Sequence, residues 1–258
     1  MQHFFTEPGN IRGKEILITG DDVNHIKNVL RMKVGEEISV SNGLDGREYR
    51  CEIVSLEDDC ITCKLMFIKE DSVELPVRIV LYQGLPKADK MEMIIQKCVE
   101  LGVYSIVPVA TKRAVVKLDD KKEKSKLARW QGISEAAAKQ SKRASIPEIK
   151  PVMSFKEAVS SIKDFASAAI PYELCEGMKD TKDWVEKVKT VSSGADEDRP
   201  LVAVFIGPEG GFDESEIELA KDNGIIPISL GKRILRTETA GMSVLSILMY
   251  ELEAAEIN

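Results

Sequence analysis

Residues 201–206, LVAVFI, are a short apolar run that continues directly into the glycine-bearing loop 207–212, GPEGGF. The same arrangement recurs where the apolar residues 225–228, IIPI, precede the loop 230–240, LGKRILRTETA. A helical pattern follows each loop. Because glycine lets the backbone approach a ligand closely, two such loops after neighbouring strands predict a ligand cleft at the edge of an α/β sheet.

Strand and helix patterns alternate from residue 77 to the end of the chain. Such alternation predicts an α/β fold, with a mostly parallel sheet covered by helices on both faces. The expected strands are Val77–Tyr82, Ile106–Val109, Ala166–Ile170 and Leu201–Ile206, and the expected helices are Lys87–Leu101, Lys121–Lys142 and Thr237–Glu253. The positions expected to be buried on the first and last of these helices are Met91, Ile94, Ile95, Cys98, Leu101, Val244, Leu245, Ile247, Leu248 and Leu252.

Residues 1 to 72 are β-rich instead, which predicts a small barrel with one embedded helix at Asp22–Arg31. Alternating strands are expected at Glu15–Thr19, Glu37–Ser41 and Tyr49–Val54, with the turn dipeptides Asn42-Gly43 and Asp45-Gly46 between the last two. The polar connection Lys69–Pro76 predicts a domain boundary, so we expect domains at 1–72 and 73–258. The acidic stretch Ser192–Pro200 predicts a surface loop.

Composition places the chain among ordinary globular proteins of 258 residues, with 43% hydrophobic and 31% charged residues. We expect no signal peptide and no membrane helix, because no basic N-terminal segment precedes an apolar run and no apolar stretch reaches about 18 residues. The five cysteines are odd in number and scattered, which favours reduced thiols. A cytoplasmic location is therefore expected.

The charge is unevenly distributed along the chain. The segment from Lys112 to Arg143 carries 11 Lys/Arg against 4 Asp/Glu, although the whole chain has a net charge of −7. An acidic protein with one basic segment attracts a polyanion to that segment and repels it elsewhere. Charge alone leaves open whether the segment binds nucleic acid or is a solvated helix face.

Histidine and metal chemistry are disfavoured. Both histidines, His3 and His25, lie in the N-terminal part, so the α/β part has no histidine for a catalytic triad or a metal site. Cys60 and Cys63 have the CxxC spacing, but no further ligand pair lies nearby in sequence. Their surroundings predict a strand, which directs the two thiols to opposite faces, so we expect no metal.

The first glycine loop matches neither a P-loop nor a GxGxxG motif. Pro208 removes an amide donor, and Glu209 would repel a phosphate, so a ligand with a neutral or cationic group suits this loop better. A structural interpretation also exists, in which Asp213 caps the next helix and Glu216 completes a capping box. That interpretation explains only the residues after Phe212.

The second loop places three cations, Lys232, Arg233 and Arg236, directly before a helix N-terminus. Cations there oppose the helix dipole, so stability disfavours them and a functional role is indicated. Arg236 is the strongest candidate, because arginine stays charged and can hold a phosphate or a developing anion. The structural alternative is an ion pair with Glu238.

A third segment, 135–143, EAAAKQSKR, ends a predicted helix with small and basic residues. Lys139, Gln140 and Arg143 occupy neighbouring helical positions. A basic helix end is also favoured by the macrodipole alone.

Taken together, these segments resemble the RsmE family of small-subunit ribosomal RNA methyltransferases in the SPOUT superfamily. The resemblance covers essentially the whole chain and is most specific in IGPEGGF (206–212) and LGKRILRTETA (230–240). It also includes HIKNVLRM (25–32), QGLPKADKM (83–91), QKCVELGV (96–103), RWQ (129–131) and the segment 135–143 followed by Ile146-Pro147. Ala88 and Lys232 depart from residues that the family often has, glycine and proline.

The resemblance implies a PUA-like N-terminal barrel and a C-terminal SPOUT domain with a deep trefoil knot. It implies S-adenosylmethionine as the methyl donor, a homodimer with its active site at the subunit interface, and methylation of N3 of one uridine near the 3′ end of 16S rRNA in the small ribosomal subunit. The cofactor-binding residues that it implies are Ile206, Gly207, Glu209, Gly210, Gly211, Leu230, Gly231, Ile234, Leu235, Arg236 and Thr239. The RNA-binding residues that it implies are Arg31, Arg113, Lys139, Gln140 and Arg143.

The residues agree with that chemistry. Loss of the N3 proton leaves negative charge on the uracil oxygens, which a fixed arginine stabilises. We assign this role to Arg236, with Arg143 as the second candidate, and leave the base open between Glu209, Glu238 and solvent. Two alternatives remain: a non-catalytic RNA-binding factor in ribosome assembly, and a methyltransferase of the same superfamily that acts on tRNA.

Overall fold

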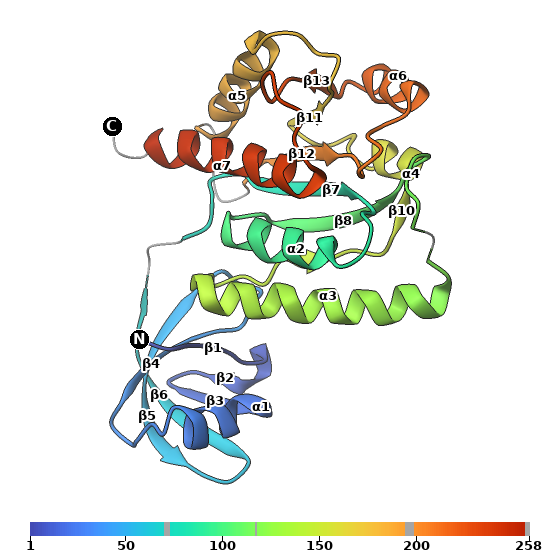
Figure 1. The fold of residues 1–258 in the computed structure, drawn as a ribbon. Helices are drawn as coiled ribbons and strands as arrows, with labels where there is room; N and C mark the ends of the chain where they lie inside the picture. Colours follow the sequence, from blue (N-terminus) through green and yellow to red (C-terminus); the bar gives the residue numbers. More distant parts are fainter. Residues whose placement is uncertain (70–72, 117, 194–198, 256–258) are drawn as a thin grey trace. The chain divides into compact units, whose positions relative to one another are not determined.

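The computed structural model describes residues 1–69, 73–116, 118–193 and 199–255 (Figure 1). The chain divides into two compact units. The first contains Met1–Glu74 and the distant segment Ala138–Ile146, and the second contains Leu75–Ala137 and Pro147–Asn258. No helix in the described part of the chain is long and apolar enough to cross a membrane.

The first unit is a curled six-stranded sheet with the strand order β1-β4-β5-β6-β3-β2. Its pairs are antiparallel except for the parallel pair β1–β4. The strands are β1 (His3–Phe5), β2 (Ile11–Arg12), β3 (Glu15–Thr19), β4 (Glu37–Ser41), β5 (Glu48–Leu56) and β6 (Cys60–Lys69). One side chain in two on these strands points inward to a core that includes Ile16, Ile18, Ile38, Val40, Ile53 and Ile61.

The embedded helix of this unit is shorter and less regular than the sequence predicts. After the 3-10 turn η1 (Pro8–Asn10), α1 spans only Asp21–Asn24 and continues as a π-helical turn, η2 (His25–Val29). Val23 and Ile26 anchor it in the barrel core. Arg31 has a φ of 55°, a left-handed conformation that ends the turn.

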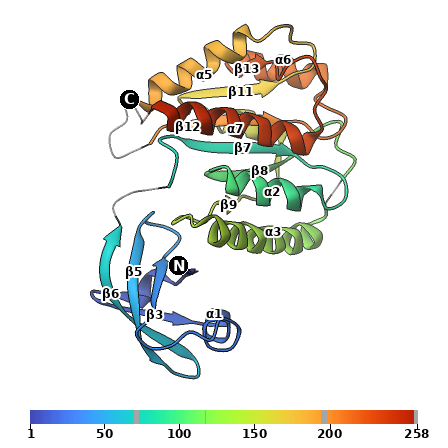
Figure 2. The same ribbon diagram turned by 60° about the vertical axis from the view of Figure 1, so that its left-hand side comes forward.

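The second unit is built on a parallel sheet with the order β10-β8-β7-β12-β11-β13, in which β9 also pairs with β8 (Figures 1 and 2). Every pair is parallel, as the strand–helix alternation predicts. The strands are β7 (Arg78–Gly84), β8 (Ser105–Ala110), β9 (Glu148–Ile149), β10 (Met153–Ser154), β11 (Ser167–Pro171), β12 (Leu201–Ile206) and β13 (Ile226–Ile228). The two glycine loops follow β12 and β13, which belong to one sheet but are not neighbours as the sequence predicted, because β11 lies between them and pairs with both.

Helices cover both faces of this sheet (Figure 2). On one face α7 packs against α2, α5 and β12, and on the other α4 packs against α6, β8 and β10. The helices are α2 (Lys90–Glu100), α3 (Asp120–Ser141), α4 (Phe155–Ser160), α5 (Lys179–Ser192), α6 (Glu214–Asp222) and α7 (Thr237–Ala255). The predicted inward positions of α2 and α7 are buried except Leu101 and Ile247, which are half-buried.

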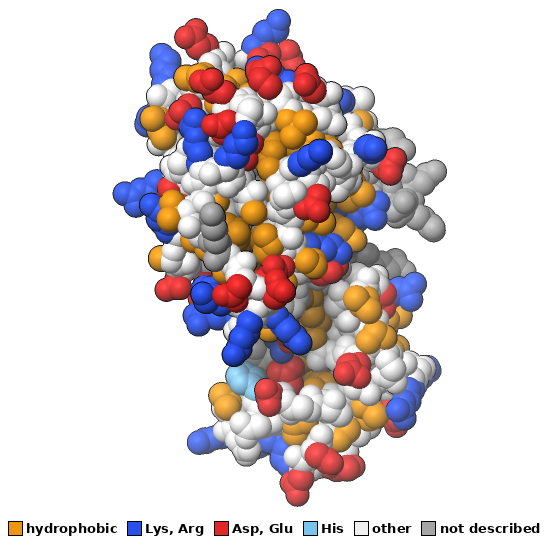
Figure 3. All heavy atoms as spheres, turned by 90° about the vertical axis from the view of Figure 1, so that its right-hand side faces the viewer, with side chains coloured by type: hydrophobic (Ala, Val, Ile, Leu, Met, Phe, Trp, Pro, Cys, Tyr) orange, Lys and Arg blue, Asp and Glu red, His pale blue; other side chains and the backbone are white. Residues whose placement is uncertain are grey.

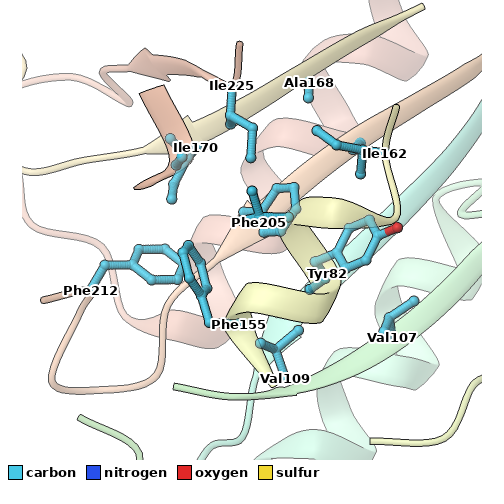
Figure 4. Packing of buried hydrophobic residues seen from close by; sticks show 14 of the residues in the cluster. Tyr82, Val107, Val109, Phe155, Ile162, Ala168, Ile170, Phe205, Phe212 and Ile225 are labelled. Atoms are coloured by element: carbon cyan, nitrogen blue, oxygen red, sulfur yellow. The ribbon is translucent and has the colours of Figure 1, made fainter. Parts of the chain in front are cut away.

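An aromatic cluster lies on the α4/α6 face of the sheet (Figure 4). Tyr82 stacks on Phe205 with ring centroids 4.4 Å apart, and Phe155 meets both Phe205 and Phe212. Phe212 is the last residue of the first glycine loop, so this cluster fixes one end of the loop in the core. Two predicted connections, Lys69–Pro76 and Ser192–Pro200, contain residues outside the described ranges, 70–72 and 194–198.

Candidate functional site

The carboxyl ends of three neighbouring strands border a cavity of about 390 Å³. The strands β11, β12 and β13 are parallel, so their carboxyl ends meet at one edge of the sheet. Figure 3 views the molecule from the side toward which β7 and β12 run. The walls of the cavity come from the loops that follow these strands and from the start of two helices. They include Lys90, Pro171, Tyr172, Glu173, Ile206, Gly207, Pro208, Glu209, Gly211, Phe212, Ser229, Leu230, Gly231, Lys232, Arg233, Ile234, Leu235, Arg236, Thr237 and Ala240.

The first loop is compact because it lacks side chains where backbones touch. A Cβ atom on Gly207 would lie 3.2 Å from the Gly211 backbone, and one on Gly84 would lie 2.6 Å from Pro208 Cδ. Gly211 has a φ of 65° and donates its N–H to the carbonyl of Pro208 at 2.9 Å. The loop therefore presents main chain to the cavity.

The predicted capping box after this loop is confirmed. Asp213 caps α6, and Glu216 closes the box by accepting from the Asp213 N–H at 2.9 Å. The other oxygen of the buried Glu216 carboxylate accepts the N–H of Lys112 at 2.9 Å. Glu216 thus fastens the loop after β8 to the start of α6.

A chain of buried hydrogen bonds connects the two loops. Gln83, at the end of β7, is fully buried and donates from Nε2 to Thr237 Oγ1 at 2.8 Å. Thr237 Oγ1 donates in turn to the carbonyl of Gly207 at 2.6 Å. The N-terminus of α7 is therefore tied to the first glycine loop. Sequence reasoning did not single out either residue for the site, although a glutamine that ends an apolar strand was visible.

The second loop is fixed at its start and open in its middle. Thr181 Oγ1 donates to the Ser229 carbonyl at 2.7 Å, and Gly231 donates its N–H to Ser229 Oγ at 3.2 Å. Gly231 has a φ of 101°, and the Ile234 side chain is 85% exposed. An apolar side chain that protrudes beside a cavity is available to cover a ligand.

Three charged side chains, Lys90, Glu209 and Glu238, form ion pairs where the two loops meet the start of α2. Lys90 Nζ lies 2.9 Å from Glu209 Oε1 and 3.6 Å from Glu238 Oε2. Glu209 also accepts the Lys87 N–H at 3.1 Å. Burial raises the pKa of Glu209, but hydrogen bonds from Lys90 and from backbone N–H groups together outweigh it, so the pKa lies below its ordinary value. Lys90 was not predicted for the site.

Arg236 is exposed at the mouth of the cavity, and no ion pair of its guanidinium is found among the described residues. The predicted structural alternative, an Arg236–Glu238 pair, is not what is observed, because the ion pair recorded for Glu238 is with Lys90. The cation therefore remains available to a ligand.

Two residues expected to bind the cofactor lie outside the cavity wall. A Cβ on Gly210 would lie 3.1 Å from Arg113 Cβ, and Arg113 Nη1 donates to the Gly210 carbonyl at 3.3 Å. Thr239 is exposed on the first turn of α7. Ile206, Gly207, Glu209, Gly211, Leu230, Gly231, Ile234, Leu235 and Arg236 all line the cavity.

The residues expected to bind RNA differ in exposure. Arg31 and Gln140 are exposed in the first unit, and Arg113 is exposed in the second. Lys139 is partly buried and pairs with Asp22 at 3.0 Å. Arg143 is buried, and its guanidinium pairs with Glu74 in the first unit, where both side chains are only 4% exposed.

The cysteines with the CxxC spacing lie in the first unit and do not line the cavity. Cys60 and Cys63 lie on β6, as predicted, and Cys63 is buried while Cys60 is half-buried. Burial raises the pKa of the Cys51 and Cys63 thiols to about 12, so both stay protonated. Within the described residues, no cluster of three or more His, Cys, Asp or Glu side chains could hold a metal ion.

Known proteins resemble the chain over its whole length. Residues 73–249 match the RNA methyltransferase domain and residues 18–66 match the RNA methyltransferase PUA domain. Ribosomal RNA small subunit methyltransferase E of Bacillus subtilis (strain 168) is 38% identical over 98% of both chains, and that of Aquifex aeolicus is 30% identical over 96% of this chain and 99% of the relative.

Solved structures give the same result. Ribosomal RNA small subunit methyltransferase E from Neisseria gonorrhoeae, bound to S-adenosyl methionine, superposes with a TM-score of 0.81 at 28% identity and covers 97% of each chain. A putative methyltransferase of Legionella pneumophila, in complex with the bound cofactor SAM, gives a TM-score of 0.79 at 31% identity over 96% of each chain. The chain therefore belongs to the ribosomal RNA small subunit methyltransferase E family.

Proposed function

We propose that this chain transfers a methyl group from S-adenosylmethionine to N3 of a uridine near the 3′ end of 16S rRNA in the small ribosomal subunit. The observation that carries the proposal is the cavity at the carboxyl edge of the sheet, where two glycine loops stand beside Arg236, a cation without an ion-pair partner among the described residues. Family membership supplies the reaction class.

The residues of the cavity fit S-adenosylmethionine. Its volume of about 390 Å³ lies within the range of roughly 300–1,000 Å³ that is usual for small-molecule sites. S-adenosylmethionine has no phosphate. This agrees with a glycine loop that contains Glu209 and lacks the lysine of a phosphate-binding loop. When bound, the cofactor supplies an activated methyl group on a sulfonium, so no metal is required.

The second loop is suited to the adenine. Leu230, Ile234 and Leu235 line the cavity. Their main-chain groups would hydrogen-bond the base, and their apolar side chains would cover its faces. Gly207, Gly211 and Gly231 let the backbone come close to the remainder of the ligand. Glu209 and Arg236 line the same cavity as the glycine loops.

Arg236 would stabilise the negative charge that develops on the uracil ring, a contribution of roughly 3–4 kcal/mol by analogy with oxyanion donors. We assign this role to Arg236 before Arg143, because the Arg143 guanidinium is paired with Glu74. Glu209 is our candidate to accept the N3 proton, because its carboxylate lines the same cavity as Arg236. Glu238 and solvent are the other possible acceptors.

We further propose an RNA-binding domain at 1–72, a methyltransferase domain with the trefoil knot at 73–258, and a homodimer that works in the cytoplasm. Exposed apolar side chains on the two packed helices α2 and α7, Met93 at 50% and Tyr250 at 69%, support a partner subunit on that face. Arg31, Arg113, Lys139, Gln140 and Arg143 are the proposed RNA contacts. Of these, Arg113 is the best site for a charge reversal, because its side chain and that of its partner Asp213 are 45% and 35% exposed and solvent screens the new repulsion. Reversal at Arg143 would instead place a buried carboxylate beside buried Glu74.

The test is a methyl-transfer assay with labelled S-adenosylmethionine on small ribosomal subunits, free 16S rRNA and tRNA, followed by mapping of the modified base. We expect label at N3 of one uridine in 16S rRNA. Label in tRNA alone would favour the tRNA-modifying alternative, and a protein without affinity for the cofactor would favour the assembly factor. Arg236→Ala should lower turnover by about 10²–10³ and change cofactor affinity only a few-fold. Unchanged turnover would remove Arg236 from the mechanism.

A further inference from the structure

We propose that Lys90 is a positioning residue: it holds Glu209 and Glu238 together and thereby keeps the Arg236 guanidinium free of a carboxylate partner. The inference rests on the proposed function, in which the negatively charged uracil ring requires an arginine without a carboxylate partner. Lys90 would act through Arg236 and would not itself bind the RNA base.

The geometry places one ammonium between two carboxylates. Lys90 Nζ lies 2.9 Å from Glu209 Oε1, within hydrogen-bond distance, and 3.6 Å from Glu238 Oε2, within ion-pair distance. The three side chains are 32%, 27% and 13% exposed, so solvent screens them only in part. A lysine has three donors on a compact charge, which allows it to serve two acceptors at once.

Glu238 is the carboxylate most in need of this cation. Its Oε2 is buried and has no hydrogen-bond partner among the described residues, so its charge is balanced by Lys90 across 3.6 Å. A buried carboxylate without a cation is costly and moves toward any cation within reach. Arg236 is such a cation, because it precedes Glu238 by only two positions. The hydrogen bond with Glu209 raises the pKa of Lys90 above its ordinary value, and the nearby Arg236 charge offsets part of this rise.

Neither carboxylate depends on Arg236 for an ion pair, because Lys90 pairs with both. One cation already serves both carboxylates, so the cluster of Lys90, Glu209, Glu238 and Arg236 contains a second cation that neither carboxylate needs for a direct ion pair. Without Lys90, the nearest replacement partner for Glu238 would be Arg236. The arginine would then be neutralised before the substrate arrives.

The inference can be tested by a double-mutant cycle on the full-length protein. Lys90→Met removes the charge and keeps an apolar stem, and Lys90→Arg keeps the charge. Glu238→Gln removes the competing carboxylate alone, and Lys90→Met/Glu238→Gln completes the cycle. Lys97→Met is the matched control, because Lys97 lies on the same helix and, among the described residues, forms an ion pair only with the partly exposed Glu100, at 2.8 Å. If Lys90→Met does not fold, Lys90→Gln takes its place in the cycle.

We expect Lys90→Met to lower kcat by about tenfold, part of the loss expected for removing the arginine altogether, with the cofactor dissociation constant changed less than about threefold. Lys90→Arg and the Lys97 control should stay within about threefold of the parent. The double variant should match Glu238→Gln alone in kcat, because neither has a buried carboxylate to capture Arg236. If the double variant is slower than Glu238→Gln by the same factor that separates Lys90→Met from the parent, the inference is overturned.

A second measurement does not depend on activity. The side-chain Nε–H resonance of Arg236, assigned by its loss in Arg236→Lys, should move on Lys90→Met to the position of a carboxylate-bound arginine and return in the double variant. If it does not move, the inference fails even when methyl transfer is normal. If the parent protein transfers no methyl group but the resonance behaves as described, the proposed function fails and the role of Lys90 stands.

Discussion

Replacing Thr237 by valine should loosen the site while it preserves the shape of the side chain. Thr237 is buried, and its hydroxyl makes two short hydrogen bonds: it accepts from Gln83 Nε2 at 2.8 Å and donates to the Gly207 carbonyl at 2.6 Å. Each bond contributes about 1 kcal/mol net, and a buried donor left without a partner costs about 1–3 kcal/mol. Because Gln83 Nε2 keeps its bond to the Gly84 carbonyl, we expect a total loss of about 2–4 kcal/mol.

Tryptophan fluorescence during urea unfolding can measure this loss. The protein has two tryptophans, and both lie in the second unit, in helices α3 and α5, so their emission reports on the unit that contains the site. Thr237→Ser is the control, because it keeps the hydroxyl and removes one methyl group, at a cost of about 1 kcal/mol. Cofactor affinity should fall in the valine variant and hold in the serine variant. A valine variant within about 0.5 kcal/mol of the parent would refute the importance of this hydrogen-bond chain.

Three further predictions concern single positions. Gly84→Ala should lower the free energy of unfolding in urea by about 1–3 kcal/mol, because its Cβ would lie 2.6 Å from Pro208 Cδ. A variant as stable as the parent would show that the loop moves to accommodate the methyl group at little cost. Gly132→Ala, in the interior of α3 with open space around it, should instead stabilise by about 0.5–1 kcal/mol in the same assay, and a loss would contradict this. Burial lowers the pKa of His3 from 6.5 to about 4. As the pH drops below 6.5, the unfolded chain therefore binds the proton before the folded chain does, and the free energy of unfolding falls. Unfolding followed by circular dichroism should find the first unit about 2 kcal/mol less stable at pH 5 than at pH 7, and His3→Gln should flatten that dependence.

The sequence predicted those features that depend on neighbouring residues. Strands such as Glu15–Thr19 and Leu201–Ile206 were placed at their observed bounds, because alternation and apolar runs are local patterns. The capping box at Asp213 was also visible, since all its atoms lie within four residues. The parallel sheet followed from strand–helix alternation, but its strand order did not, because pairing joins segments far apart in the chain.

The parts of the site that were missed depend on long-range contacts. Gln83 and Thr237 are separated by 154 positions, and the Glu209 carboxylate meets the Lys87 backbone across 122. No periodicity encodes such pairs. The same applies to Arg143. The sequence shows it only as one of several basic residues at a helix end, whereas in the structure it pairs with Glu74, 69 positions away.

The first unit contains Ala138–Ile146 as well as Met1–Glu74, and this has a consequence for synthesis. Arg143 supplies the guanidinium for Glu74, and Ile146 donates its N–H to the Gly43 carbonyl at 3.2 Å. In a nascent chain that has left the ribosomal tunnel only as far as residue 74, the barrel would thus be incomplete, and the Glu74 carboxylate would lack the Arg143 guanidinium. The barrel is complete only when residue 146 has left the tunnel, after more than half of the polypeptide has been translated.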